Sequence, residues 1–211
     1  MFQHWGGWDS HTLVFMYGLF IFNKGIAAFF TTSLYSIEGH VRDGSFDGMM
    51  VRPISPIIQI LGEQFEMGEL VNVTIGICIL LVMIKRYCVC NACIAVAFIL
   101  MFAIISVLLV FAIRLICMSV SFWTLTSYPI AIVIDNFSDF AKYPITIYNS
   151  MMKIVLEYII PFSALAYFPT LVILENRIEV LFVSLLVVVV MFILAIFIWN
   201  KGLKNYQSCG H

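Results

Sequence analysis

Residues that could do catalytic or metal chemistry are few and scattered in this sequence. The four histidines lack the close spacing of a metal-binding helix, and they are His4, His11, His40 and His211. There is no phosphate-binding glycine loop, zinc-protease helix or nucleophile elbow. Cys88, Cys90 and Cys93 form a dense thiol group without an evident fourth ligand, and free cysteine behaves as a small hydrophobe. We therefore expect no catalytic residue, cofactor or metal site in this chain.

Two basic residues stand inside long apolar runs. Lys24 lies near the centre of the first run, and Arg114 lies near the middle of a later one. A basic residue at mid-bilayer costs about 2.5–3.5 kcal/mol on insertion scales, so it normally faces protein or water. Both are candidate intramembrane polar residues. Two alternatives are open for each: a functional or partner-facing role, or structural pairing with another residue of the chain.

The composition indicates the class of protein in which these two basic residues lie. Of the 211 residues, 63% are hydrophobic and 11% are charged, and the mean hydropathy is +1.04. Soluble domains carry about 25% charged residues. The chain is therefore predicted to be an all-α integral membrane protein, a polytopic helical bundle in the lipid bilayer. A net charge of -1 without any basic block excludes nucleic acid as a partner.

Five membrane spans are predicted within one transmembrane domain, residues 1–211. A span needs roughly 20 apolar residues, and the predicted spans are about 13–37, 70–84, 92–123, 155–174 and 180–199. The third is interpreted as one long helix followed by a partly embedded connection. Residues 136–153 are expected to form an interfacial helix that stops at Pro144. Pro161 and Pro169 predict an irregular fourth span.

The longest polar stretch, 38–69, joins the first two predicted spans. Within it, Ser55 and Pro56 predict a helix start, and the apolar stripe that follows extends to Phe65. A cytoplasmic loop leaves six basic residues near span ends inside and three outside, as the positive-inside rule favours. Those inside are Arg42, Arg52, Lys142, Lys153, Lys201 and Lys204, and those outside are Lys85, Arg86 and Arg177.

The loop contains two notable segments, Arg42-Asp43-Gly44-Ser45-Phe46-Asp47 and Arg52-Pro53-Ile54-Ser55-Pro56. Later in the chain come Phe140-Ala141-Lys142-Tyr143-Pro144-Ile145-Thr146-Ile147-Tyr148, Ile160-Pro161-Phe162, Tyr167-Phe168-Pro169 and the terminal 201–208. Taken together and in this order, these segments resemble a poorly characterised branch of the bacterial type-2 ABC (ATP-binding cassette) exporter permeases. Lys142 replaces the arginine that is usual in that branch.

The resemblance implies a six-helix, multi-pass permease of the bacterial cytoplasmic membrane. It implies a dimer with a second copy or a paralogue, driven by a separate ABC ATPase subunit that binds the ATP. One more spanning helix precedes the position of Phe2 in the family, so we expect either that the sequence is truncated there or that the protein works with five helices.

The family's cytoplasmic loop contacts the ATPase, so the resemblance assigns coupling to the loop here. Prolines there supply stiffness, because proline fixes its own φ and restricts its neighbour. The guanidinium groups of arginines can form paired hydrogen bonds with carboxylates on the partner. The expected coupling residues are Arg42, Asp43, Asp47, Arg52, Pro53 and Pro56.

The favoured hypothesis is the membrane-spanning subunit of an ABC exporter, without an ATPase site of its own. The alternative is a partner-independent intramembrane enzyme or carrier that uses Lys24, Arg114 and Glu157. A non-transporting membrane scaffold is the third possibility. The apolar helices select no particular solute.

Overall fold

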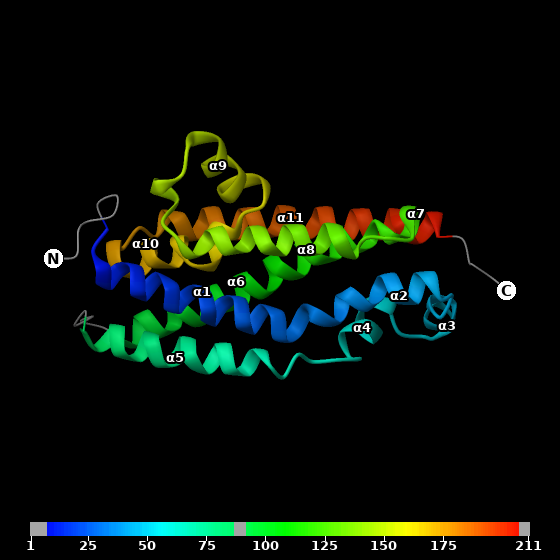
Figure 1. Cartoon of the computed structure of the whole chain (residues 1–211), viewed down its shortest axis with the longest axis horizontal. Helices are drawn as coiled ribbons and strands as arrows, with labels where there is room; N and C mark the ends of the chain where they lie inside the picture. The colour runs from blue at the N-terminus through cyan, green and yellow to red at the C-terminus, as the bar shows by residue number, and fades with distance from the viewer. Residues whose placement is uncertain (1–7, 87–91, 207–211) are drawn as a thin grey trace.

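The computed structural model describes residues 8–86 and 92–206, which form a long helical bundle without β-strands in these ranges (Figure 1). The first helical run changes its winding towards its C-terminal end: α1 covers Ser10–Thr31, a 3₁₀ segment η1 covers Thr32–Tyr35, and α2 covers Ser36–Arg42. The hydroxyls of Thr31 and Thr32 each donate to the carbonyl four residues earlier, at 2.7 Å. Such bonds often bend helices, and here they adjoin the tighter segment.

The polar loop is folded into two short helices. Gly44 adopts φ +73° just after α2, where a left-handed turn favours glycine. Helix α3 then covers Phe46–Val51, and α4 covers Pro56–Leu61. The predicted helix start at Pro56 is confirmed, but α4 ends at Leu61, before the predicted Phe65. Gly62 follows as the C-cap.

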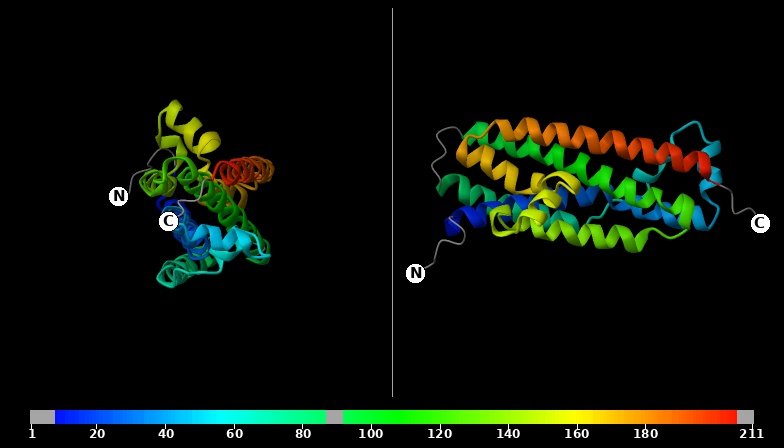
Figure 2. Two further views of the ribbon diagram at one scale, coloured as in Figure 1. Left: turned by 90° about the vertical axis from the view of Figure 1, so that its right-hand side faces the viewer. Right: turned by 90° about the horizontal axis from the view of Figure 1, so that it is seen from above.

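After the loop, one long helix returns through the bundle and a second runs back towards the loop end (Figure 1). α5 covers Glu69–Arg86 and packs on α1, where Gly76 faces the backbone of Phe22; a Cβ at Gly76 would lie 2.8 Å from the Phe22 Cα. α6 covers Ala92–Ser119 and is followed by the short α7, Ser121–Thr124. α6 packs against both α1 and α11, so it is the central helix of the bundle (Figure 2).

The region after α7 returns along the bundle in short pieces. They are α8 at Tyr128–Phe137, η2 at Ser138–Lys142, η3 at Ile145–Ile147, α9 at Ser150–Ile154, a π-helical turn η4 at Val155–Ile159, η5 at Phe162–Leu165 and α10 at Tyr167–Glu175. α9 projects from the side of the bundle (Figures 1 and 2). The irregularity predicted for the fourth span, 155–174, is found at Pro161, where the chain breaks, and again before Tyr167, whereas Pro169 lies inside α10.

The predicted interfacial helix over 136–153 is corrected. Up to Pro144, where the helix is expected to stop, the segment is the end of α8 and the 3₁₀ turn η2; beyond Pro144 lie the 3₁₀ turn η3 and most of α9. Its Asp139 contacts Lys24, which lies near the middle of the helical run Ser10–Arg42. This segment therefore packs beside the centre of the bundle.

The last helix, α11, covers Glu179–Asn205 and runs the length of the bundle. Within the described residues, three helical runs are long and apolar enough to cross a membrane: Ser10–Arg42, Ala92–Thr124 and Glu179–Asn205. They coincide with the first, third and fifth predicted spans. α5 is not among them, because its 18 residues include the charged Glu69, Lys85 and Arg86; its apolar stretch, 70–84, reaches about 22 Å, whereas the hydrocarbon core is about 30 Å thick.

Candidate functional site

The polar segment between the first two long helices is fixed to the ends of α7 and α11 by an aromatic side chain. Phe46 of α3 is fully buried, and its ring centroid lies 5.3 Å from that of Phe122, 6.1 Å from Trp199 and 5.2 Å from Tyr206. Gly202 of α11 leaves room for Phe122, since a Cβ at Gly202 would overlap that ring. Phe46 therefore packs α3 against α7 and the C-terminal part of α11.

A second set of contacts ties α2 to the chain after α4. The Nδ1 of His40 lies 2.8 Å from the Ser45 hydroxyl, and its Nε2 lies 2.9 Å from a Glu63 carboxylate oxygen. The Ser36 hydroxyl donates to the same carboxylate at 3.0 Å. These polar bonds close the segment into one folded unit.

The Arg-Pro turn before α4 is held by a glutamine. The Gln59 amide nitrogen donates to the carbonyls of Met49 and Ile54, at 2.9 and 2.7 Å. Its amide oxygen accepts a hydrogen bond of 3.3 Å from Arg52. Arg52 and Pro53 are themselves exposed. The turn that presents Arg52 is therefore stabilised from inside by a residue that sequence reasoning did not select.

The other predicted coupling residues lie around the same segment and do not converge on one pocket. Arg42 and Asp43 are exposed, with the Arg42 Nε 3.6 Å from the Asp43 Oδ1. Asp47 is half-buried in the first turn of α3, and Pro56 is half-buried at the start of α4. Their arrangement is that of a surface rather than a catalytic centre.

Apolar side chains share that outer surface. Val51 is 87% exposed, Ile54 52% and Ile58 62%. Exposed aliphatic side chains beside charged ones are found at protein–protein contacts. We call Arg42, Val51, Arg52, Ile54 and Ile58 the outer face of the loop.

Glu38 connects the beginning of α2 to the beginning of α8. Its Oε2 accepts hydrogen bonds from the backbone nitrogens of Ser127 and Tyr128, at 2.6 and 2.5 Å. A carboxylate at a helix N-terminus satisfies free amides and opposes the positive end of the helix dipole. The polar segment is thereby linked to the α8 start as well as to α7 and α11.

Arg114 of α6 lies in a buried ionic network. Its Nη2 donates to the Asp135 Oδ2 at 2.7 Å, and its Nη1 donates to the Thr31 hydroxyl at 2.8 Å. The Tyr35 hydroxyl donates to the same aspartate, and the Arg114 guanidinium lies 4.9 Å from the Tyr35 ring centroid. One network therefore joins α6, α8, α1 and η1.

Lys24 of α1 has a more open environment. Its Nζ lies 2.6 Å from the Asp139 Oδ1, and the Lys142 Nζ lies 3.8 Å from the other oxygen of Asp139. The side chains of Lys24, Asp139 and Lys142 are 34%, 51% and 31% exposed. Two ammonium groups thus share one carboxylate on an accessible surface.

Both basic residues that the sequence places inside apolar runs have ion-pair partners in the structure. Lys24 and Arg114 are each paired with a different aspartate, so structural pairing is found for both. Glu157 lies in η4 and belongs to neither pair. The structure therefore does not favour an enzyme or carrier built on Lys24, Arg114 and Glu157.

No group of three or more metal-ligating side chains that could hold a metal ion is found in 8–86 and 92–206. Cys93 is a free, exposed thiol. Cys88 and Cys90 lie outside the described residues, so their predicted role is not addressed by the structure.

The whole-chain comparison is decisive for the family. The sequence model described as "ABC-2 family transporter protein" matches residues 1–210. The chain belongs to this ABC-2 family. No curated protein and no solved structure matches it. The ABC-2 chain is thus a multi-pass, membrane-embedded permease component, of a family whose members normally work with an ABC ATPase subunit.

Proposed function

We propose that this chain is the permease subunit of an exporter in the bacterial cytoplasmic membrane. ATP hydrolysed by a separate ABC ATPase subunit drives an unidentified solute outward through it. The proposal is supported by family membership together with the folded loop between α2 and α5.

The observation that carries the proposal is how this loop is built. Its inner side is anchored by Phe46 to helix ends and by Glu38 to α8, whereas its outer face presents Arg42, Arg52 and exposed aliphatic side chains. A coupling element needs both properties: a face that docks the motor, and stiff attachments that carry the motion into the membrane helices.

Replacement of Arg52 by glutamate tests the coupling role. The Arg52 guanidinium can form paired hydrogen bonds with a carboxylate of a partner, and a glutamate at this position reverses the charge. We expect the amount of ATPase subunit that copurifies with the permease to fall at least tenfold, which corresponds to about 1.4 kcal/mol of binding free energy.

Arg177→Glu is the matched control. Arg177 is exposed between α10 and α11, at the end of the bundle opposite the loop, so this variant should retain its ATPase subunit. Both variants should elute as single symmetric peaks in size exclusion. Full retention of the ATPase subunit by a well-folded Arg52→Glu protein contradicts the coupling role.

We further propose that α5 and the broken chain from α8 to α10 complete five crossings, and that the transporter contains a second copy or a paralogue. Lys85 and Arg86 end α5, and long basic side chains extend a short span by reaching the interface. The mass of the purified complex tests the stoichiometry, which we expect to be two permeases with two ATPase subunits.

A further inference from the structure

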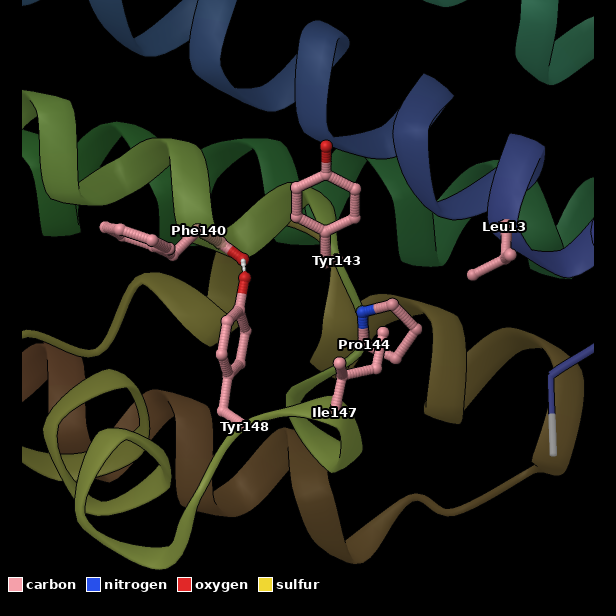
Figure 3. Close-up of a pocket in the computed structure, with 6 residues that line it drawn as sticks. All are labelled: Leu13, Phe140, Tyr143, Pro144, Ile147 and Tyr148. Carbon is pink, nitrogen blue, oxygen red and sulfur yellow. Dashed lines mark hydrogen bonds between the residues drawn. The ribbon is translucent and has the colours of Figure 1, made fainter. Parts of the chain in front are cut away.

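A cavity of about 610 Å³ lies between the start of α1 and the chain around η3 (Figure 3). It is lined almost wholly by apolar and aromatic groups, from Leu13, Phe140, Tyr143, Pro144, Ile147 and Tyr148. Its size lies within the range of about 300–1,000 Å³ that small-molecule sites occupy. The cavity could therefore hold the apolar part of a small ligand.

Specific hydrogen bonds hold the wall of this cavity in place. The Tyr148 hydroxyl donates to the Phe140 carbonyl at 3.0 Å, the dashed line in Figure 3. The Trp8 indole nitrogen donates to the Thr146 hydroxyl at 3.0 Å, which fastens η3 to the chain before α1. The cavity is thus a formed feature of this segment.

An excess of positive charge adjoins the cavity. Lys24 and Lys142 share the single carboxylate of Asp139, and the Lys142 contact is the longer, at 3.8 Å against 2.6 Å. The Lys142 Nζ lies 5.7 Å from the ring centroid of Tyr143, which lines the cavity. Lys142 is therefore the cation that is placed to pair with an acidic ligand.

The position of this cluster limits what the surface can face. Lys24, near the middle of the first candidate membrane-spanning run, and its partner Asp139 in η2 are one-third and one-half exposed. Exposed charges at that depth are very costly against acyl chains and face water or protein instead. The surface therefore borders a polar path rather than bulk lipid.

We propose that this cavity binds a long-chain carboxylate, whose apolar tail fills the cavity and whose acidic head pairs with Lys142. Charge complementarity selects an acidic head, and the lining selects an aliphatic tail. The interpretation of this ligand as the exported solute rests on the proposed function, whereas the site itself does not.

Photolabelling of the purified chain tests the site in the absence of any ATPase subunit. The labelling result can therefore be interpreted even if the proposed association with an ATPase subunit is wrong. The probe is azistearate, a stearate that carries a mid-chain diazirine, and the matched neutral probe is its methyl ester. We expect saturable labelling of 140–148 by the acid and much weaker labelling by the ester. The apparent dissociation constant follows from the dose dependence, with adducts located by mass spectrometry.

Three substitutions complete the test. Lys142→Gln should weaken labelling by the acid about fivefold, the value of one partly exposed ion pair, and Lys142→Arg should restore it. Ile147→Trp should abolish labelling by filling the cavity. Lys204→Gln removes the same charge from the far end of α11 and should change nothing. Equal labelling by acid and ester, or unchanged labelling of Lys142→Gln and Ile147→Trp, overturns the proposal.

Discussion

The two ion pairs made by α8 and η2 differ in their burial, although their aspartates are only four residues apart. The side chains of Arg114 and Asp135 are 7% and 21% exposed, whereas those of Lys24 and Asp139 are 34% and 51% exposed. The first pair has further partners in Thr31 and Tyr35. The second shares its carboxylate with Lys142. A buried, multiply bonded charge fixes the structure, whereas a shared and accessible charge is available to a ligand.

The largest effect on stability is expected from breaking the buried pair on one side. Asp135→Ala leaves Arg114 charged and unpaired, which costs about 3–5 kcal/mol. Titration with a denaturing detergent, followed by circular dichroism, measures the loss. The double variant Arg114→Met with Asp135→Leu should recover most of it, because no unpaired charge remains. A loss below 1 kcal/mol in Asp135→Ala would show that the pair is not structurally important.

Tyr35→Phe should have an intermediate effect. It removes only the hydroxyl that donates to Asp135 and keeps the ring beside Arg114. A hydrogen bond to a charged group contributes about 1.5–3 kcal/mol, so the same titration should show a loss in that range. Tyr143→Phe is the control, because the Tyr143 hydroxyl makes no hydrogen bond to the described residues. Equal effects in both variants would contradict a special role for the buried network.

The smallest effect is expected at the exposed pair. Asp139→Asn should change the free energy of unfolding by less than about 1 kcal/mol, because partly exposed ion pairs contribute little. Salt near 1 M should reduce even this difference by screening. The same variant leaves Lys24 and Lys142 uncompensated, so it should strengthen labelling by azistearate. A loss as large as that of Asp135→Ala would remove the contrast between the two pairs.

The sequence identified the two basic residues but not their partners. Lys24 and Arg114 are conspicuous because their neighbours are apolar. Asp135 and Asp139 follow a long apolar run in a mixed segment and carry no local sign that they would fold back onto α6 and α1. Their four-residue spacing places them on one helical face, which could have indicated a common role. Contacts over 115 positions, as between Lys24 and Asp139, depend on tertiary packing.

The sequence predicts the long helices, which follow from the length of the apolar runs. It does not predict the bounds of the short helical pieces between the chain breaks. The runs that became α1, α6 and α11 exceed the length of a span, so their helices follow from composition. The pieces between Ser138 and Tyr167 depend on packing around Pro144 and Pro161, and only the irregularity was foreseeable. In the loop, Phe46 stands between polar residues and looks like surface, yet it is the anchor.

The 3₁₀ segment η1 lies between Thr31, which contacts Arg114, and the residue that contacts α8, Glu38. Thr31, just before this segment, and Thr32, its first residue, contact Arg114, whereas Glu38, beyond its end in α2, caps α8. A 3₁₀ helix rises about 2.0 Å per residue and an α-helix 1.5 Å. Rewinding these four residues into α-helix would shorten the run by about 2 Å and turn the loop by roughly 80°. Rewinding of this short stretch would thus couple a rotation of the loop to a shift along the axis of α1.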